Sequence, residues 1–263
     1  MQTAAWRLVV ASAVGTSHIT TCSPCQDSAD FATLEIAGSE TLLIALSDGA
    51  GSAKHSDIAS RIAVRRLVQL ATDFLEDGGS VEALERGHVL TWVSDILVML
   101  HRISTEAEHS IRDYACTLLA ALVSENCCAF IQIGDGAIVV SENEEDGWNW
   151  VFWPQHGEFA NTTNFLISPD ALDVLEFESS PRRIEEIALF SDGLENLLLQ
   201  NSEKAAHAPF FNTVFPPVRA ATPGFSHELS QALHNYLVSP VICDRTDDDK
   251  SLMLASRRAS PQP

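Results

Sequence analysis

The order of strand-like and helix-like patterns along the chain limits its fold more than any other feature. Short apolar runs rich in β-forming residues come first, two long segments of helical periodicity follow, and strand-like runs return before one more helix and a final strand. Consecutive strands with no helix between them are most simply joined as antiparallel neighbours. The order therefore predicts an α+β fold built on antiparallel sheets.

Turn residues separate the individual elements. The predicted strands cover residues 6–13, 31–37, 41–47, 118–123, 127–133, 137–140, 184–190 and 251–255. The predicted helices cover residues 58–74, 84–103, 194–199 and 227–238. A Pro-rich stretch over 205–223 is predicted to be a loop. Because no repeat or linker divides the chain, we expect a single domain over residues 1–256 and a frayed tail over 257–263.

Charge and hydropathy exclude several classes of partner. The 263 residues include 16 basic and 36 acidic side chains, so the formal net charge is −20. A surface this acidic repels nucleic acid and anionic lipid. No apolar run approaches the roughly 18 to 20 residues that a membrane-spanning helix needs. Residues 1–15 loosely imitate a secretory signal but are better interpreted as an opening strand, so we expect a cytoplasmic protein without nucleic-acid or membrane partners.

Six cysteines favour a reduced compartment, because a chain of this length does not need disulfides to hold its core. They are Cys22, Cys25, Cys116, Cys127, Cys128 and Cys243. Cys22 and Cys25 form a lone Cys-x-x-Cys, for which two loop residues are a simpler interpretation than a zinc or redox site. Trp148, Trp150 and Trp153 likewise fit aromatic packing around a strand better than a platform for sugars or bases.

Three aspartates stand at the ends of predicted strands. Asp48 and Asp192 each follow an apolar run and precede a glycine, and Asp248 stands just before the last strand. If these strands are neighbours, the carboxylates crowd together and need a countercharge. Carboxylates, a backbone carbonyl and water suit Mg²⁺ or Mn²⁺ better than zinc. Each Asp-Gly pair alone is also a common turn, so the pattern leaves both a divalent metal site and plain turns open.

Six short motifs occur in a characteristic order along the chain. They are Gln26-Asp27, Ser47-Asp48-Gly49-Ala50-Gly51, Cys116-Thr117-Leu118-Leu119, Gly134-Asp135-Gly136, Ser191-Asp192-Gly193-Leu194 and Asp248-Asp249-Lys250-Ser251. With these motifs the chain resembles, over nearly its whole length, the metal-dependent serine/threonine phosphatases of type 2C, the PPM family. Two further stretches, residues 15–27 and 157–163, are most similar to a bacterial branch of that family.

The resemblance implies a fold and a metal site. The fold would be a sandwich of two antiparallel β-sheets flanked by pairs of helices, with two Mn²⁺ or Mg²⁺ ions at one edge. Asp48 would bridge the two ions, and the Gly49 carbonyl would bind one of them. Asp192 and Asp248 would bind the other ion.

Two more aspartates have implied supporting roles. Asp27 would stand behind the ligands or hold a metal-bound water, and Asp135 matches a position that helps to hold a third, weaker ion in some members. The ligand of the last motif could be Asp248 or Asp249. Family spacing to Ser251 favours Asp248, and the two-residue period of a strand would turn Asp249 the other way.

The implied chemistry is hydrolysis of phosphoserine and phosphothreonine in proteins. A metal-bridging water of lowered pKa would attack phosphorus in line, without a phosphoenzyme, while the metals neutralise the phosphoryl oxygens. The expected partner is a phosphorylated protein, either a serine/threonine kinase or its target. Two alternatives stay open: a non-catalytic regulator that binds a phosphorylated partner or kinase, and a phosphoesterase for small molecules.

Four positions depart from the family pattern. Cys22 stands where many members have an arginine that grips phosphate, and Gln26 replaces a glutamate beside the first-loop aspartate. Ala50 replaces a histidine that is a candidate general acid, and Ser52 replaces a second glycine. Substrate binding and protonation of the leaving group would therefore need other residues.

Possible replacements lie in the same loops. His18, Lys54 and His55 could bind phosphate or protonate the leaving oxygen, although loop solvation is the simpler interpretation of each alone. Arg182 and Arg183 belong either to a loop beside the substrate or to an ordinary basic turn. The catalytic residues predicted from the sequence are His18, Asp27, Asp48 and Asp192.

Overall fold

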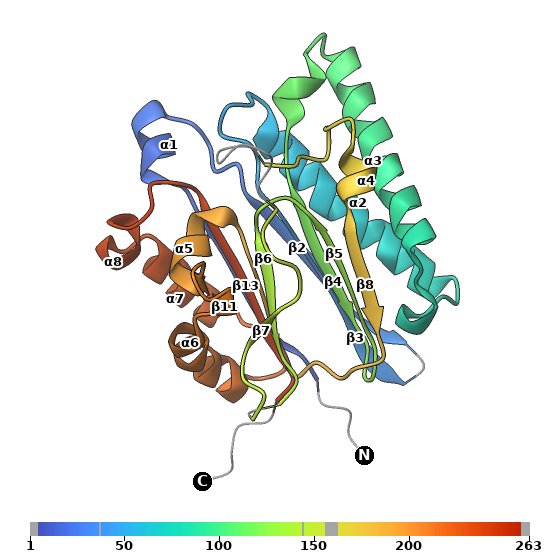
Figure 1. Cartoon of the computed structure of the whole chain (residues 1–263), viewed down its shortest axis with the longest axis vertical. Helices are drawn as coiled ribbons and strands as arrows, with labels where there is room; N and C mark the ends of the chain where they lie inside the picture. The colour runs from blue at the N-terminus through green and yellow to red at the C-terminus, as the bar shows by residue number, and fades with distance from the viewer. Residues whose placement is uncertain (1–4, 37, 144, 156–162, 259–263) are drawn as a thin grey trace.

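Two β-sheets pack face to face, and helices cover the outer face of each (Figure 1). The computed structural model describes residues 5–36, 38–143, 145–155 and 163–258. In Figure 1 the long helices α2 and α3 lie on one side of the sandwich, and α5 to α8 lie on the other. This arrangement confirms the predicted α+β fold of antiparallel sheets flanked by helices.

Both sheets are antiparallel apart from one short edge pair. The six-stranded sheet contains, in spatial order, β12 (Gly224–Phe225), β1 (Arg7–Ala13), β13 (Lys250–Ser256), β9 (Glu186–Phe190), β6 (Ala137–Ser141) and β7 (Asn149–Trp150). The five-stranded sheet contains β2 (Ser28–Ile36), β3 (Ser39–Ser47), β4 (Leu118–Val123), β5 (Cys128–Ile133) and β8 (Glu176–Ser180). Strands β12 and β1 pair in parallel, at the outer edge of the first sheet.

The layer between the sheets consists of apolar side chains from the central strands. Ile44 of β3, Phe130 of β5 and Leu189 of β9 are each at most 1% exposed there. Strands β4, β5, β6 and β9 are buried along their whole length because helices also cover their outer faces. This double burial explains why they appear in the sequence as continuous apolar runs instead of alternating ones.

Two pairs of helices complete the sandwich. Helices α2 (Ser56–Glu76) and α3 (Arg86–Glu106) pack on the five-stranded sheet, and α6 (Ala208–Ala220) and α7 (His227–Leu237) pack on the six-stranded sheet. The other elements are short: α1 (Thr16–Thr21), α4 (Ala171–Val174), α5 (Glu195–Leu198), α8 (Pro240–Cys243), η1 (Val81–Ala83), η2 (Ile111–Tyr114), η3 (Asp192–Leu194), β10 (Leu199–Gln200) and β11 (Ala205–Ala206).

The Pro-rich stretch predicted to be a loop folds instead into α6. Phe211 and Phe215 lie one turn apart on this helix and are completely buried against the six-stranded sheet, followed by a buried valine. A proline inside a helix costs about 3 kcal/mol, and Pro216 and Pro217 both lie inside α6. Burial of a large apolar side chain contributes roughly 1.5 to 3 kcal/mol each. Tertiary packing therefore offsets the local cost of the prolines.

The tryptophans pack as the sequence suggested, although not as one strand. Trp148 stacks against Phe215 of α6, with the ring centroids 4.5 Å apart. The rings of Trp150 and Trp153 contact edge to face, with their centroids 5.4 Å apart. Since β7 contains only Asn149 and Trp150, Trp148 and Trp153 pack from the segments on either side of this strand.

The predicted C-terminal tail begins with a buried residue. Arg257 is 3% exposed and donates hydrogen bonds to the carbonyl oxygens of Ile184, Ser124 and Glu125 at 2.6, 2.9 and 3.1 Å. Its guanidinium also lies over the ring of Trp6, 4.9 Å from the centroid. The prediction of a frayed end is thus wrong for Arg257, which ties β13 to the loops of both sheets. The last five residues lie outside the described part of the chain.

Two further expectations concern helices and cysteines. Among the residues that the structure describes, no helix is both long and apolar enough to cross a bilayer. All six cysteines carry free thiols. Cys22 is exposed and ends α1 in a left-handed conformation, and Cys25 is half-buried in the loop that follows.

Candidate metal centre

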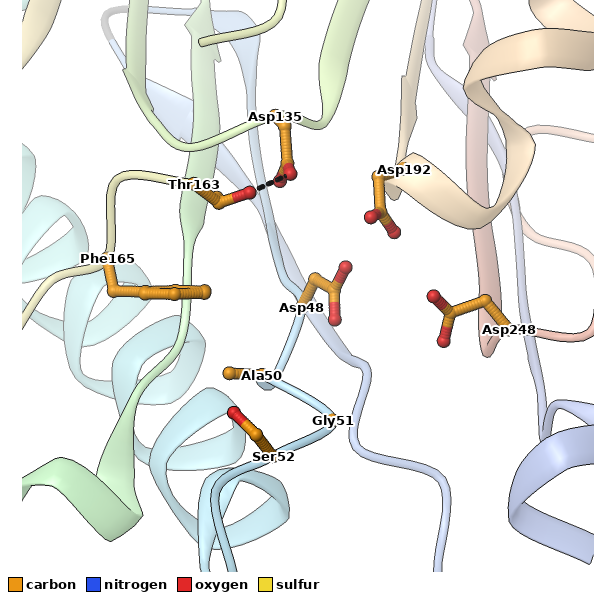
Figure 2. A pocket seen from close by; sticks show the side chains of 9 residues that line it. All are labelled: Asp48, Ala50, Gly51, Ser52, Asp135, Thr163, Phe165, Asp192 and Asp248. Atoms are coloured by element: carbon orange, nitrogen blue, oxygen red, sulfur yellow. Dashed lines mark hydrogen bonds between the residues drawn. The ribbon is translucent and has the colours of Figure 1, made fainter. Parts of the chain in front are cut away.

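Four aspartates from four strand ends meet at one end of the sandwich. Asp48 follows β3, Asp192 follows β9, Asp135 lies in the turn between β5 and β6, and Asp248 stands two residues before β13. They line a cavity of about 290 Å³. Figure 2 shows the four carboxylates around this cavity, with Ala50, Gly51, Ser52, Thr163 and Phe165 completing its wall.

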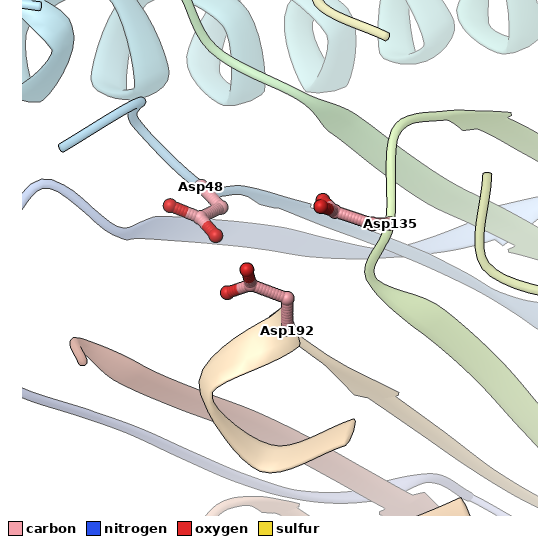
Figure 3. A group of neighbouring side chains, drawn as sticks. All are labelled: Asp48, Asp135 and Asp192. Carbon is pink, nitrogen blue, oxygen red and sulfur yellow. The ribbon is translucent and has the colours of Figure 1, made fainter. Parts of the chain in front are cut away.

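Three of the carboxylates are close enough to share an ion. Asp48, Asp135 and Asp192 each offer one oxygen such that all three oxygens lie within 4.8 Å of one another (Figure 3). Asp248 faces Asp192 and Asp48 from the other side of the cavity in Figure 2. The structure therefore brings together the aspartates that the sequence had selected at separate strand ends, together with Asp135.

The strand ends are held close by a few specific backbone contacts. The backbone N–H of Asp48 donates to Thr117 Oγ1 at 2.9 Å, and the Asp48 carbonyl accepts from the Thr117 N–H at 2.8 Å. At the other strand end, a Cβ placed on Gly193 would lie only 2.0 Å from the carbonyl oxygen of Asp249. Glycine is required there because it lets the turn after β9 approach the start of β13.

Burial and mutual repulsion raise the pKa values of Asp27, Asp48 and Asp248. Burial, followed by the charges of Asp27 and Asp192, raises the pKa of Asp48 well above its usual range. Burial also raises the pKa of Asp27 to about 7, although a hydrogen bond from Ser191 Oγ at 2.8 Å opposes this shift. The pKa of Asp248 is raised by burial and by the charge of Asp192. In each case burial is the largest cause, and the charges of neighbouring carboxylates raise the pKa further.

The donor atoms fit a hard divalent cation. None of the side chains lining the cavity is cationic, and the available donors are carboxylate and hydroxyl oxygens. Three buried oxygens, Asp27 Oδ1, Gln26 Oε1 and Asp192 Oδ1, have no hydrogen-bond partner among the described residues. Orphaned buried oxygens around clustered carboxylates are the expected signature of a place for ions and their water ligands. An all-oxygen set suits Mg²⁺ or Mn²⁺.

Asp248 and Asp249 have different surroundings. Asp249 is 2% exposed and accepts the backbone N–H groups of Gly15 and Gln26 at 2.6 and 2.5 Å. Both of its oxygens are therefore used to hold the first loop of the chain. Asp248 instead lines the cavity. The two neighbouring carboxylates therefore have different surroundings, one at the cavity and one at the first loop.

Asp27 and Gly49 lie immediately behind the cavity. Asp27 is 6% exposed and is bonded to Ser191, the neighbour of Asp192. Gly49 is buried, and a Cβ on it would lie 2.8 Å from the Gln26 carbonyl oxygen. Asp27 is thus linked to the segment that contains Asp192, and the Gly49 backbone packs closely against the first loop of the chain.

The basic candidates are distributed differently from the aspartates. His18 lies at the edge of the cavity, as described below. The His55 ring stacks on the ring of His109, with the centroids 4.1 Å apart. Neither His55 nor the exposed Lys54 is among the cavity-lining residues. Arg182 and Arg183 lie at the opposite end of β5 from Asp135. They follow the end of β8, which pairs with the start of β5, and Asp135 follows the end of β5. A six-residue strand places them about 20 Å from the cavity, so they form a basic turn remote from the site.

Sequence reasoning missed two residues of the cavity wall. Thr163 Oγ1 donates a hydrogen bond to Asp135 Oδ2, and Phe165 presents its ring beside Ala50 (Figure 2). Thr163 ends the stretch that resembles the bacterial branch, but residues 156–162 of that stretch lie outside the described part of the chain. No sequence signal marked Phe165, because its place depends on a loop packing against another loop.

An antiparallel sandwich with an all-oxygen cavity at its strand ends has the architecture of a protein that binds divalent metal ions. Comparisons with known proteins are more specific. A family model described as protein phosphatase 2C matches residues 14–237. Serine/threonine-protein phosphatase 3 of Escherichia coli (strain K12) is 36% identical over 256 residues, which cover 95% of this chain and 98% of that protein. The chain therefore belongs to the protein phosphatase 2C family, as its motifs suggested.

Solved structures show the same fold at much lower identity. A bacterial serine phosphatase superposes with a TM-score of 0.64 at 16% identity, covering 97% of this chain and 99% of that one. A serine/threonine phosphatase from Staphylococcus aureus gives 0.59 at 15% identity, with 95% and 94% covered. The catalytic domain of the phosphatase PstP, solved in complex with two manganese ions, gives 0.58 at 16% identity, with 96% and 98% covered.

Proposed function

We propose that this chain is a metal-dependent protein phosphatase that hydrolyses phosphoserine and phosphothreonine. The observation that carries the proposal is the meeting of Asp48, Asp135 and Asp192 within 4.8 Å in a chain of the protein phosphatase 2C family. The 36% identity with a curated serine/threonine phosphatase, over nearly the full length of both chains, supports the same activity.

Two Mn²⁺ or Mg²⁺ ions would be held by the residues of the cavity. Asp48 would bridge them, Asp192 and Asp248 would bind one ion, and the Gly49 carbonyl would bind the other. When bound, such ions lower the pKa of coordinated water and neutralise charge on the phosphoryl oxygens. Asp135, positioned by Thr163, is suited to a third and weaker ion.

The remaining residues position this site. Asp27 would accept a hydrogen bond from water in the site through its unpartnered Oδ1, while its Oδ2 stays bonded to Ser191. Without cations, the four carboxylates would repel a phosphate dianion, since none of the side chains that line the cavity supplies positive charge. Metal binding is therefore a condition for substrate binding as well as for catalysis.

The substrate would be a phosphorylated protein, and we propose that it is a serine/threonine kinase or the target of one. The net charge of −20 disfavours nucleic acid and anionic membranes as partners. We place the protein in the cytoplasm, in keeping with its six free cysteines.

Hydrolysis assays with defined metals test the proposal. A phosphothreonine peptide and p-nitrophenyl phosphate are incubated with Mn²⁺, with Mg²⁺ and with EDTA, using the wild type, Asp192→Asn and Asp244→Asn. Asp244 lies in the same segment as Asp248 but outside the cavity, so it controls for the loss of one charge. We expect metal-dependent turnover that is lost in Asp192→Asn and kept in Asp244→Asn.

Two results would point to the alternatives. A folded wild type that binds Mn²⁺ yet hydrolyses neither substrate would overturn the proposal and leave a regulator that binds phosphorylated partners. Turnover of p-nitrophenyl phosphate that a large excess of phosphopeptide does not inhibit would indicate a phosphoesterase for small molecules.

A further inference from the structure

A buried carboxylate and an imidazole lie side by side at the edge of the metal cavity. His18 Nδ1 is 3.0 Å from Asp249 Oδ2, and the two side chains are 12% and 2% exposed. His18 belongs to α1, near the start of the chain, and Asp249 directly precedes β13, near its end. Among the described residues Nδ1 makes no hydrogen bond, so the contact is one between opposite charges whenever the imidazole is protonated.

Asp249 is a fixed neighbour for this imidazole. Its Oδ1 accepts the backbone N–H of Gly15 at 2.6 Å, and its Oδ2 accepts that of Gln26 at 2.5 Å. These two hydrogen bonds fix the positions of both carboxylate oxygens. The carboxylate therefore stays on the His18 side of the loop and does not compete for ions in the cavity.

The other ring nitrogen of His18 lies near a residue of the cavity wall. A Cβ placed on Gly51 would lie 3.8 Å from His18 Nε2, and Gly51 is one of the residues that line the cavity. Because Gly51 has no side chain, nothing from this residue separates the imidazole from the cavity. The same position would lie 4.0 Å from Gln26 Oε1, so His18 and Gln26 approach one stretch of the cavity rim together.

The proposed reaction creates a need for a proton at this rim. When the phosphorus–oxygen bond of phosphoserine or phosphothreonine breaks, the electron pair stays on an alkoxide, which must be protonated to leave. The cavity lining itself offers four carboxylates and the hydroxyls of Ser52 and Thr163, but no imidazole or ammonium group. An imidazolium beside the lining is the suitable donor at neutral pH.

We propose that His18 gives the proton on Nε2 to the leaving serine or threonine oxygen and that Asp249 is the positioning residue that holds its ring. After the transfer, the neutral imidazole keeps its proton on Nδ1, facing Asp249, and regains the Nε2 proton from solvent. The proton of the attacking water passes to solvent. This inference rests on the proposed phosphatase function.

The test compares leaving groups that do and do not need a proton. p-Nitrophenolate is stable as an anion in water, whereas an alkoxide is not. With Mn²⁺ bound, we expect His18→Asn to lower kcat on a phosphothreonine peptide about 100-fold or more, with p-nitrophenyl phosphate affected only a few-fold. Added imidazole should restore part of the lost phosphopeptide turnover. Asp249→Asn should show the same selectivity with a smaller loss.

Controls separate chemistry from folding and metal binding. His101→Asn changes an exposed histidine of α3 and should leave both activities unchanged. Calorimetric titration with Mn²⁺ should give the same affinity for His18→Asn as for the wild type. In the metal-free protein, ¹⁵N NMR of the neutral His18 ring should show the proton on Nδ1, a preference that Asp249→Asn should weaken.

The outcomes distinguish this inference from the proposed function. A wild type that hydrolyses both substrates, with His18→Asn slowed equally on both or on neither, would overturn the role of His18 alone. A wild type inactive on both substrates with every metal would overturn the phosphatase function and this inference with it. A neutral His18 ring protonated on Nε2 would refute the positioning role of Asp249.

Discussion

The metal-free protein should lose stability as the pH rises from mildly acidic to neutral. Burial raises the pKa of Asp27 to about 7 and that of Asp48 well above its usual range. An unfolded aspartate titrates near about 3.9, so between these values the folded state binds more protons than the unfolded state. The free energy of unfolding therefore falls with increasing pH until Asp27 is ionised in both states.

The size of the effect follows from the pKa difference of Asp27. A shift of about 3 units at about 1.36 kcal/mol per unit corresponds to roughly 4 kcal/mol in total. About 2.5 kcal/mol of this lies between about pH 5 and about pH 7.5, where other surface carboxylates are already ionised. Asp48 contributes with the same sign. Cations in the cavity would remove the penalty by neutralising the carboxylates.

Urea unfolding of EDTA-treated protein at these two pH values measures the effect. The wild type should lose a few kcal/mol on going to the higher pH, and Asp27→Asn, which cannot ionise at this position, should lose about 2.5 kcal/mol less. Mn²⁺ should restore the wild type at the higher pH. The reasoning is refuted if the metal-free wild type is equally or more stable at the higher pH. It is also refuted if the free energy of unfolding of Asp27→Asn decreases by as much as that of the wild type.

Three further predictions concern metal binding and packing. Mn²⁺ at about 100 times its Kd should raise the unfolding free energy of the wild type by about 2.7 kcal/mol but leave Asp192→Asn nearly unchanged; an equal shift in both would argue against Asp192 as a ligand. Arg257→Met leaves three carbonyl oxygens without their donor. Urea unfolding should show a free energy of unfolding lower by about 3 kcal/mol or more. A decrease of less than about 1 kcal/mol would contradict this account. Phe215→Ala should lower the free energy of unfolding by about 3 to 5 kcal/mol. Val98→Ala, at an exposed position, should lower it by less than about 0.5 kcal/mol. Similar losses in the two variants would mean that α6 contributes little to the core.

Local periodicity was sufficient to predict most of the secondary structure. The predicted strand over 118–123 coincides with β4, and the predicted helix over 227–238 ends one residue beyond α7. These segments repeat apolar residues with the period of the face they bury, so the pattern is present in the chain itself. The sequence did not reveal α6, because two prolines disfavour a helix locally and the burial that outweighs them exists only in the folded protein.

The aspartates of the cavity were predictable for a related reason. Asp48, Asp192 and Asp248 stand at strand ends, and antiparallel strands in stacked sheets place such ends together, so their type and position already indicated an oxygen-rich cation site. The sequence by itself thus determined the strands, the long helices and the acidic residues of the cavity. Only the tertiary structure decided that Asp249 turns to His18 and that Arg257 is buried. These contacts join residues more than 70 positions apart, and no local pattern of charge or hydropathy specifies which distant partner a side chain meets.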